Sequence, residues 1–338
     1  MTGDSSPGRF DLSGSNILVT GGTGSFGRRF VHRLLNEHDP ARVVVFSRDE
    51  DKQYDMALSL PQSSHPSLRY FIGDVRDQSR LELAMRDIDV VIHAAALKHV
   101  PTAEYNPFEC IRTNVHGAEN VVQAALRTDV KRVIALSTDK ASNPINLYGA
   151  SKLASDKIFV AANNISGSVA TRFSVVRYGN VIGSRGSIVP MFRRLIAEGV
   201  DALPITDERM TRFWITLDQG IDFVVRCITD MQGGEIFIPK IPSMKVVDIA
   251  SAMAPDLPHR VIGIRPGEKL HEVMVTTDDA RLTLELDDRY IIEPDFAFWS
   301  REGYKSFGAS RVAPDFSYAS DKNDHWLDHD TFRALLDD

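Results

Sequence analysis

The chain has 338 residues, 43% of them hydrophobic, so it is long enough to bury one large core or two interleaved ones. A formal net charge of −7 excludes a general attraction to nucleic acid or an anionic membrane, so an anionic ligand needs a local cluster of Arg and Lys. Cys110 and Cys227 lack zinc or redox spacing, and neither a signal peptide nor a long apolar run occurs, so we expect a soluble, cytoplasmic protein.

The first half of the chain alternates short β-branched runs with longer helical patterns. The runs are nearly continuous in apolar residues, as expected for strands that are buried on both faces. This alternation predicts right-handed βαβ units and an α/β fold, namely a Rossmann-like, doubly wound parallel sheet with helices on both faces. The predicted strands lie within residues 16–20, 41–47, 68–74, 89–96, 131–137 and 171–183.

The rhythm changes after Gly179, where prolines become more frequent and the segments are short and mixed. We expect a smaller C-terminal α/β substrate-binding lobe there, assembled with help from the first domain. Beyond about Thr276 the pattern weakens, and the C-terminal residues are polar with scattered aromatic side chains. The predicted organisation is a flexible N-terminus (1–12), a nucleotide-binding Rossmann domain (13–178), an interleaved substrate-binding lobe (179–300) and a C-terminal tail (301–338).

A glycine-rich turn follows the first predicted strand and opens a helix. In such a turn the backbone approaches a pyrophosphate closely, and the helix N-terminus offers free N–H groups and the positive end of its dipole. The spacing TGxxGxxG differs from the three-glycine pattern of most dehydrogenases and resembles that of the short-chain dehydrogenase/reductase superfamily. The predicted cofactor contacts in this turn are Gly21, Thr23, Gly24, Ser25, Phe26 and Gly27.

The second predicted strand ends in FSRDE, with Ser47 and Arg48 where an acid would bind the ribose 2′-hydroxyl of NAD. A hydroxyl and a guanidinium suit a 2′-phosphate, so NADP is favoured over NAD. Asp49 and Glu50 follow directly, and the alternative is that Arg48 is merely solvated. Further cofactor contacts are expected where the third and fourth strands end, at Asp74, Val75, Ala94 and Ala95.

Tyr148 and Lys152 are four residues apart at the start of a predicted helix. A tyrosine hydroxyl is a poor base at neutral pH, but a lysine one turn away and a cationic nicotinamide ring lower its pKa by favouring the phenolate. Thr138, at the end of the fifth strand, is placed to hydrogen-bond the same substrate hydroxyl. The three residues predict removal of a proton from an alcohol while hydride leaves for NADP⁺, with Tyr148 and Lys152 also contacting the cofactor.

Asp139 and Lys140 follow Thr138, and a simple dehydrogenase needs neither of them. Once a sugar C4 alcohol has become a ketone, the C5 proton is acidic, and its removal expels the C6 hydroxyl if an acid protonates that oxygen. Asp139 is the natural acid and Lys140 the natural base, each with a pKa moved toward neutrality by burial and by the other charge. The alternative is a surface ion pair at a strand end.

These segments resemble the extended short-chain dehydrogenase/reductases that act on nucleotide sugars, most closely the inverting UDP-N-acetylglucosamine 4,6-dehydratases that begin pseudaminic acid biosynthesis. The resemblance runs from about Ser13 to about Met274. The motifs that carry it are TGGTGSFG, SRDEDKQYDM, AALKHVPTAEYNP, STDKASNPINLYGASK, RYGNVIGSRGSIVP, MTRFWIT and RPGEKLHE.

The resemblance implies that Asp139 is the acid, Lys140 the C5 base and Tyr148 the C4 base in forming a UDP-2-acetamido-2,6-dideoxy-4-keto-hexose of L-arabino configuration. Relatives that retain the C5 configuration are large and membrane-anchored, and they usually carry methionine where this chain has Tyr148. Tyr148 therefore favours the inverting branch. The resemblance also implies a homo-oligomer.

Candidate contacts with the UDP-sugar come mainly from the second lobe. Arg212 and Arg265 suit bidentate phosphate contacts, and Glu268 can accept a hydrogen bond from a ribose hydroxyl. Each residue also has an ordinary interpretation as a surface charge or packing residue, above all Arg185 and Lys98. The predicted set is Lys98, Asn180, Arg185, Arg212, Arg265 and Glu268.

His93 and His99 lack a carboxylate partner at a metal-binding spacing, so structural roles are expected and no metal is implied. Two other functions remain open at this point. A nucleotide-sugar epimerase or a retaining dehydratase of the same fold would use the same cofactor site. A non-enzymatic NADP sensor is disfavoured because Tyr148 and Lys152 are both present.

Overall fold

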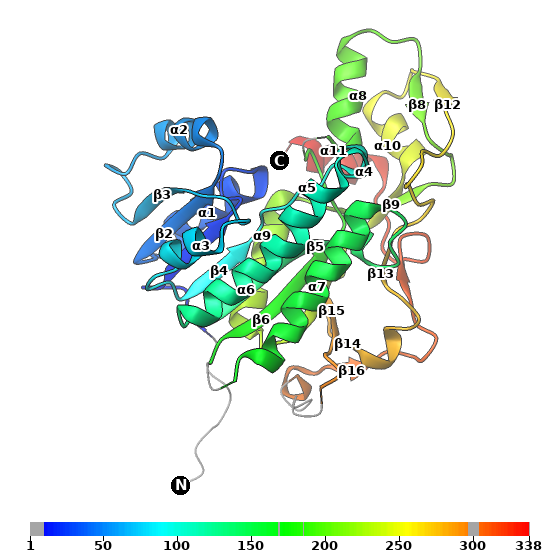
Figure 1. Cartoon of the computed structure of the whole chain (residues 1–338). Coiled ribbons are helices and arrows are strands. Elements are labelled where there is room, and N and C mark those ends of the chain that lie inside the picture. Colours follow the sequence, from blue (N-terminus) through cyan, green and yellow to red (C-terminus); the bar gives the residue numbers. More distant parts are fainter. Residues whose placement is uncertain (1–9, 168–169, 185, 297–303, 338) are drawn as a thin grey trace.

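A computed structural model describes residues 10–167, 170–184, 186–296 and 304–337 (Figure 1). Its centre is a ten-stranded sheet in the order β16-β14-β15-β10-β6-β5-β4-β1-β2-β3. From β3 to β10 all neighbouring strands are parallel. The parallel strands are β1 (Asn16–Thr20), β2 (Arg42–Ser47), β3 (Leu68–Ile72), β4 (Val90–His93), β5 (Arg132–Thr138), β6 (Arg172–Tyr178) and β10 (Ile236–Pro239).

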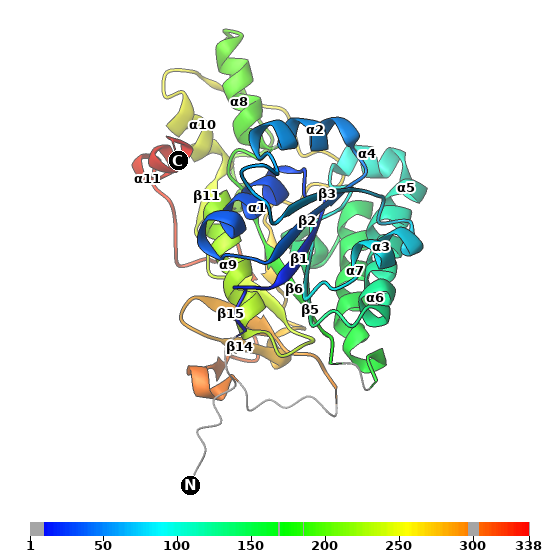
Figure 2. The same ribbon diagram turned by 90° about the vertical axis from the view of Figure 1, so that its left-hand side faces the viewer.

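Helices cover both faces of this sheet, as Figure 2 shows. On one face lie α1 (Ser25–Glu37) and α9 (Leu217–Asp230), and on the other lie α3 (Gln78–Ala84), α6 (Gly117–Arg127) and α7 (Leu147–Ile165). The strands are buried on both sides because each face is covered, which explains their continuous apolar sequences. The predicted Rossmann-like doubly wound fold is confirmed, with strand bounds within a few residues of those expected.

The strand order reverses between β1 and β4. From β1 the sheet continues through β2 and β3 to one edge, and from β4 it continues through β5 and β6 toward the other. In open parallel sheets the crevice beyond the carboxyl ends of the strands at such a point binds ligands. The remaining strands of the sheet come from the far end of the chain and run antiparallel: β15 (Arg289–Ile292), β14 (Thr283–Glu285) and β16 (Ser310–Arg311). Residues from the second half of the sequence therefore extend the sheet of the first half.

A smaller group of elements stands above the carboxyl ends of the strands (Figure 1). Its core is separate and includes Trp214 from β9, which packs edge-on against Phe332 of the C-terminal helix. It comprises β7 (Asn180–Val181), α8 (Ile188–Ala197), β8 (Leu203–Ile205), β9 (Thr211–Ile215), β11 (Ser243–Lys245), α10 (Val246–Met253), β12 (His259–Val261) and α11 (His329–Asp337). Nearby, β13 (Val273–Val275) pairs with β17 (Tyr318–Ala319).

The remaining helical elements are short and occur in the connections between the strands along the chain. They are α2 (Glu50–Ser59), α4 (Val100–Tyr105), α5 (Pro107–Ile111), the π-helix η1 (Arg112–His116), and the 3-10 turns η2 (Asp139–Ala141), η3 (Ala280–Leu282) and η4 (Lys305–Phe307). Within the described part of the chain, no helix is both long enough and apolar enough to cross a membrane.

Candidate active site

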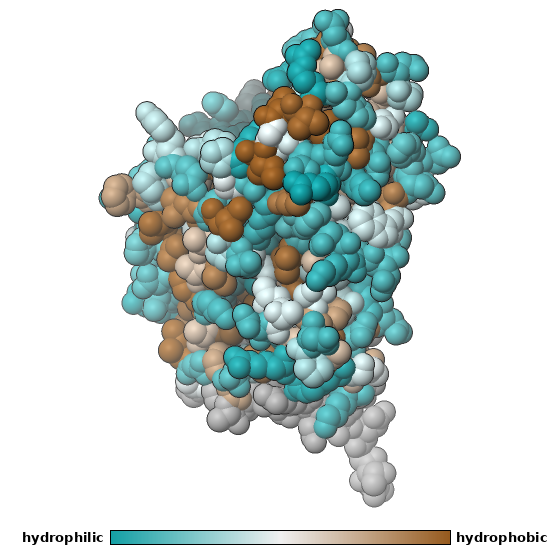
Figure 3. Space-filling model, turned by 90° about the vertical axis from the view of Figure 1, so that its right-hand side faces the viewer, coloured by the Kyte–Doolittle hydropathy of each residue, from teal (hydrophilic) through white to brown (hydrophobic). Residues whose placement is uncertain are grey.

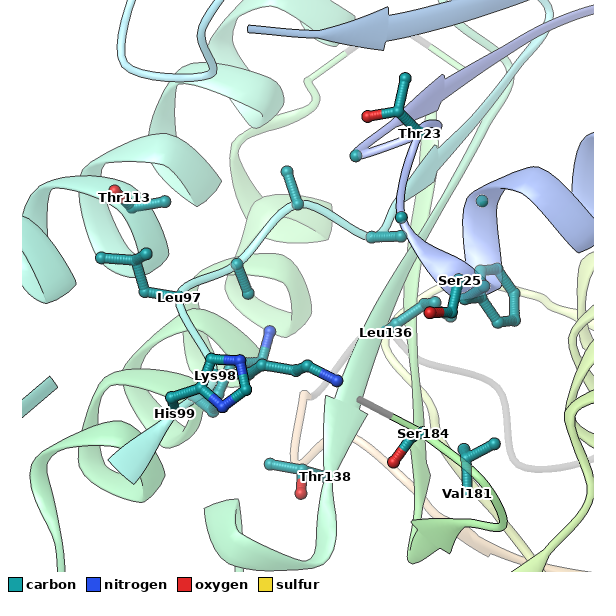
Figure 4. A pocket seen from close by; sticks show the side chains of 18 of the residues that line it. Thr23, Ser25, Leu97, Lys98, His99, Thr113, Leu136, Thr138, Val181 and Ser184 are labelled. Carbon is teal, nitrogen blue, oxygen red and sulfur yellow. The ribbon is translucent and has the colours of Figure 1, made fainter. Parts of the chain in front are cut away.

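A cavity of about 630 Å³ opens at the reversal of strand order, between the sheet and the smaller group of elements (Figure 4). The glycine turn forms one wall, the ends of β4 and β5 form the floor, and the segment after β6 faces them. The cavity is lined by many of the residues that the sequence analysis predicted as cofactor, catalytic or substrate contacts. The predicted residues on its wall are Gly21, Thr23, Gly24, Ser25, Phe26, Gly27, Ser47, Arg48, Asp74, Val75, Ala94, Ala95, Lys98, Thr138, Lys140, Tyr148, Lys152 and Asn180.

The turn from Gly21 to Gly27 has no room for larger residues. Gly21 has a φ of +65°, and a Cβ there would lie 2.9 Å from the Cα of Ala95. A Cβ on Gly27 would lie 2.5 Å from the Cα of Gly22, so glycine lets α1 pack directly on the turn. The helix cap at Gly24 has no side-chain hydrogen bond, which leaves the first N–H groups of α1 to an anionic ligand. These features fit a dinucleotide pyrophosphate.

The end of β2 presents cations to the cavity. Arg48 is half exposed and lies 3.6 Å from Asp74, and the Ser47 hydroxyl is 2.8 Å from that of Thr23. Asp49 caps α2 by accepting from the Lys52 N–H, and its side chain also pairs with the Lys52 ammonium. The negative charge of Asp49 is therefore partly neutralised. Lys52, which sequence reasoning missed, lines the same wall four residues after Arg48.

Tyr148 and Lys152 start α7 and face the cavity, as predicted. Asn146 caps this helix by accepting from the Gly149 N–H at 2.8 Å. Gly149 is required there, since a Cβ would lie 2.2 Å from the carbonyl oxygen of Lys140. The beginning of α7 is thus pressed against the turn that carries Asp139 and Lys140, which brings both halves of the predicted chemistry into one place.

Burial raises the pKa of Tyr148 to about 12. The positive charge of Lys140 and a hydrogen bond with Thr138 offset this only in part. The pKa of Lys152 is itself lowered by burial, although the nearby carboxylate of Asp156 works against that shift. Among the lysines, Lys140 is the one that acts to lower the pKa of Tyr148 here. The predicted lowering by Lys152 together with a cationic nicotinamide ring stays a prediction.

Asp139 and Lys140 form an ion pair and do not lie on an open surface. The Lys140 Nζ is 3.0 Å from Asp139 Oδ1, which also accepts from the Thr138 hydroxyl at 2.9 Å. Asp139 is completely buried, and its Oδ2 has no hydrogen-bond partner among the described residues. Lys140 lines the cavity, whereas Asp139 lies behind it.

The pKa of Lys140 is raised, which contradicts the predicted shift toward neutrality. Burial alone favours the neutral amine, but the carboxylates of Asp139 and Glu272 outweigh it. Glu272 comes from the segment before β13 and lies 3.5 Å from the Lys140 Nζ. Glu272 is the last residue of RPGEKLHE, but sequence reasoning singled out only Arg265 and Glu268 in that motif. It missed Glu272 because nothing in the sequence brings this position close to Lys140, which is 132 residues away.

The predicted substrate residues are only partly brought together. The Oδ1 of Asn180 is 3.5 Å from the Lys140 Nζ, and Lys98 points into the cavity (Figure 4). Arg212 instead donates to the backbone carbonyls of residues 211, 269 and 270. Its contact with a phosphate stays a prediction.

Arg265 and Glu268, which were predicted to bind the nucleotide sugar, do not line the cavity. Arg265 and Glu268 lie 3.6 Å apart, and Glu268 Oε2 is buried without a hydrogen-bond partner among the described residues. Arg185 lies outside the described residues. Their contacts with a nucleotide sugar remain predictions.

The loop that carries Lys98 is held by a residue that sequence reasoning also missed. Asn114, in the π-helix η1, accepts from the Leu97 N–H at 2.8 Å and donates to the Leu97 carbonyl at 2.9 Å. It also donates to Ser151 on α7 at 2.9 Å. π-Helical turns occur often at functional sites, and here the turn aims one amide at the loop after β4.

His93 is buried and its Nδ1 is 2.9 Å from the Thr20 hydroxyl. Burial lowers the pKa of His93 to about 3, so its ring is neutral at physiological pH. Among the described residues, no cluster of three or more His, Cys, Asp or Glu side chains is arranged to hold a metal ion.

Comparisons with known proteins show to which family the chain belongs. The family described as "Polysaccharide biosynthesis protein" matches residues 17–294. The chain is 58% identical to a UDP-N-acetylglucosamine 4,6-dehydratase (inverting) of Campylobacter jejuni over 92% of this chain and 94% of that protein. It is 40% identical to a UDP-glucose 4-epimerase of Rickettsia akari, over 95% of this chain and 93% of that protein.

Solved structures show the same fold. The X-ray structure of Pen from Bacillus thuringiensis has a TM-score of 0.86 and 35% identity, covering 97% of this chain and 99% of that one. A dTDP-glucose 4,6-dehydratase from Streptomyces venezuelae, solved with NAD and TYD, has a TM-score of 0.68 at 24% identity, covering 86% and 95%. The second likeness concerns the fold alone.

Proposed function

The chain belongs to the polysaccharide biosynthesis protein family, an enzyme family of the short-chain dehydrogenase/reductase type, and we propose that it is a UDP-N-acetylglucosamine 4,6-dehydratase that inverts C5 and uses NADP. The observation that carries the proposal is the Asp139–Lys140 ion pair beside Tyr148 at one cavity. The high identity to the Campylobacter jejuni protein supports the same substrate.

In the first half of the reaction Tyr148 removes the proton of the C4 hydroxyl, which Thr138 holds by a hydrogen bond. The positive charge of Lys140 favours the phenolate that this step needs. Bound NADP⁺ would accept hydride from C4 and give it back at C6, so no net redox change occurs. The residues that would hold it are those of the glycine turn, together with Tyr148 and Lys152 on the same cavity wall.

In the second half Asp139 and Lys140 share one proton. Transfer of that proton from Lys140 to Asp139, across 3.0 Å, converts an ion pair into a carboxylic acid and an amine. The amine takes the C5 proton, the C5–C6 double bond forms, the C6–O bond breaks, and Asp139 protonates the departing oxygen to give water. Lys140 ends as ammonium and Asp139 as carboxylate, which is the ion pair that the structure contains. Return of hydride to C6 leaves an enolate that must take up a proton at C5. The proton that Tyr148 received from the C4 hydroxyl balances this step, and inversion requires that it reach the face of C5 opposite to Lys140. Since Asp139 is buried behind the wall, its carboxyl group must turn toward the cavity when the sugar enters.

The preference for NADP is supported by the charges at the end of β2. Arg48 and Lys52 both line the cavity. The carboxylate of Asp49 accepts a hydrogen bond from the Lys52 N–H and pairs with the Lys52 ammonium, so its negative charge is partly neutralised. A 2′-phosphate would meet two cations, whereas the 2′-hydroxyl of NAD would gain less from them. Titration of the protein with each dinucleotide tests this preference, and equal affinity would remove it.

The wider setting is proposed from the resemblance: a cytoplasmic enzyme at the first step of a pseudaminic acid-type pathway, assembled as a homo-oligomer. Hydrophobic side chains gather in patches on the face shown in Figure 3. Tyr105 and Phe108, from α4 and α5, are 88% and 76% exposed. Large exposed apolar side chains in patches support association. Light scattering after size-exclusion chromatography measures the assembly, and a monomer at all concentrations would contradict it.

The reaction is tested by incubating the purified protein with UDP-N-acetylglucosamine and NADP in deuterated water. Mass spectrometry and proton NMR of the product report loss of water, deuterium at C5 and the C5 configuration. Loss of water with inversion supports the proposal, and loss of water with retention would leave a dehydratase of the other stereochemistry. A C4 epimer without loss of water would instead make the protein an epimerase, and the roles given to Asp139 and Lys140 would be withdrawn.

A further inference from the structure

Glu272 is a buried carboxylate that faces the catalytic turn from the second half of the chain. It is 2% exposed. Its Oε1 lies 3.5 Å from the Nζ of Lys140 and 3.7 Å from the Nε of Arg212, and its Oε2 lies 3.8 Å from the Nζ of Lys269. Oε2 has no hydrogen-bond partner among the described residues. A buried charge is costly unless it is paired, so this carboxylate depends on the three cations around it.

The backbone around Glu272 is fixed in place by the C-terminal segment. Its N–H donates to the Ser320 hydroxyl at 2.9 Å, and its carbonyl accepts from the Ser320 N–H at 2.8 Å. The Ser320 hydroxyl is also 2.7 Å from that of Thr211. Residue 272 is therefore held between β9 and β17, and its side chain has little freedom to move away from Lys140.

The same segment is tied directly to the catalytic turn. The Lys269 ammonium donates to the carbonyl of Ser142 at 2.6 Å, just after η2. Asn146, which caps α7, donates to the carbonyl of Gly267 at 2.7 Å. The residues from 267 to 272 thus form a backing for the turn that carries Asp139 and Lys140.

We propose that Glu272 is a positioning residue for Lys140, holding its amine beside Asp139 and keeping on the pair the one proton that the elimination uses. The inference rests on the proposed dehydratase reaction. Glu272 does not touch the sugar in this role. It acts through Lys140, which reaches the cavity wall while Glu272 does not.

The electrostatics of the cluster give the proposal a sign. The charged or titratable groups around Lys140 and Glu272, from every element packed on them, are Asp139, Tyr148, Arg177, Arg212 and Lys269. Burial lowers the pKa of Lys140, whereas the carboxylates of Asp139 and Glu272 raise it. Removing the charge of Glu272 therefore lowers the pH at which the Asp139–Lys140 pair loses its shared proton.

The decisive variant is Glu272→Gln, which keeps the shape of the side chain and removes its charge. We expect kcat for elimination to fall at least about tenfold, because Lys140 is less firmly held beside Asp139. The alkaline limb of the kcat–pH profile should move to lower pH. C4 oxidation does not use Glu272, so reduced nicotinamide should accumulate on the enzyme during the first turnover, as seen by its absorbance.

A matched control is Glu293→Gln at the end of β15. Glu293 is also 2% exposed, but it pairs with Arg311 at 2.9 Å, whereas Glu272 pairs with Lys140. Its replacement removes the charge of a buried carboxylate whose arginine partner is 43% exposed, so we expect lower stability with an unchanged pH profile. A second test variant, Glu272→Asp, keeps the charge and draws it back from Lys140. It should lower kcat while moving the alkaline limb less than Glu272→Gln does.

The outcomes are distinct. If the wild type dehydrates UDP-N-acetylglucosamine and Glu272→Gln keeps the wild-type alkaline limb without accumulating reduced nicotinamide, the proposal is wrong and Glu272 is only structural. If Glu272→Gln does not fold, wild-type kcat and profile in Glu272→Asp would overturn it equally. Failure of the wild type to release water from the sugar would instead overturn the proposed function, which the variants do not affect.

Discussion

Lys140 and Lys152 are two lysines of one active site whose pKa values move in opposite directions. Burial disfavours the charged form of both. Lys140 contacts the carboxylates of Asp139 and Glu272, and its pKa is raised. Lys152 has Asp156 nearby, and its pKa is lowered.

The difference lies in how many carboxylates act on each lysine. Asp156 accepts from the Ser137 hydroxyl at 2.8 Å and from the Arg177 guanidinium at 3.2 Å. Its charge is shared before Lys152 benefits from it. Asp156, like Asp139 and Glu272, keeps its other oxygen without a hydrogen-bond partner among the described residues, so this does not separate the two lysines. Two carboxylates lie 3.0 and 3.5 Å from the Lys140 Nζ, whereas Asp156 alone raises the pKa of Lys152 against burial. Within one site, the number of carboxylates beside a lysine therefore sets the direction in which its pKa moves.

The largest effect that separates the two lysines is expected for Lys140→Ala. Elimination should fall by about a thousandfold or more, because the C5 base is lost. NADP binding should survive. C4 oxidation should slow much less than elimination, because Lys140 only favours the Tyr148 phenolate in that step, so reduced nicotinamide should accumulate on the enzyme. Rapid-mixing absorbance and product NMR measure this, and full dehydration by the variant would remove Lys140 from the mechanism.

Tyr148→Phe is the matching change on the side of Lys152. The C4 base is lost, so both oxidation and elimination should fall by about a hundredfold to ten-thousandfold. No reduced nicotinamide should accumulate, in contrast to Lys140→Ala. If the two variants gave the same transient, the division of labour between α7 and η2 would be wrong.

Asp156→Asn should show how much the ion pair between Asp156 and Arg177 contributes to the free energy of unfolding. Arg177 is 3% exposed and would lose its charged partner, so the free energy of unfolding should fall by about 3 kcal/mol. Urea denaturation measures the loss. A variant as stable as the wild type would show that Asp156 is not committed to Arg177.

His93 extends the comparison to a buried base whose Nδ1 lies beside the Thr20 hydroxyl. Its pKa falls from the ordinary 6.5 to about 3 in the folded protein. The unfolded chain then binds a proton below pH 6.5 that the folded protein refuses, so stability is lost as the pH falls through the window from 6.5 to 3. Between pH 6.5 and 5 the loss from this one group should be about 2 kcal/mol. A smaller pH dependence in His93→Gln would confirm the source.

The smallest expected effect concerns the far end of the cavity. Replacing Lys52 by Ala should weaken NADP binding by about tenfold, through loss of one charge-assisted contact, and leave NAD binding nearly unchanged. Isothermal titration compares the two dinucleotides. An equal loss for both would place Lys52 away from the 2′-phosphate.

The cofactor half of the site could be predicted because its residues act where the chain itself puts them. The glycine turn must follow β1 directly, and Tyr148 and Lys152 share a helix face by their spacing. The same reasoning could not predict the pKa of Lys140, since Glu272 reaches it only through the packing of β13 against β17. The same reasoning also could not predict that the guanidinium of Arg212 donates to the backbone carbonyls of residues 269 and 270.

By itself, the sequence determined the parallel sheet, the glycine turn and the acid–amine pair, because alternation, local turns and helical spacing depend on neighbouring residues. Only the tertiary structure decided which charges meet. The burial of Asp139, the approach of Glu272 and the commitment of Asp156 to Arg177 join segments that are distant in the chain. The physical reason is that a pKa depends on the distance to other charges in space and on the exclusion of water, and neither follows from the order of the residues alone.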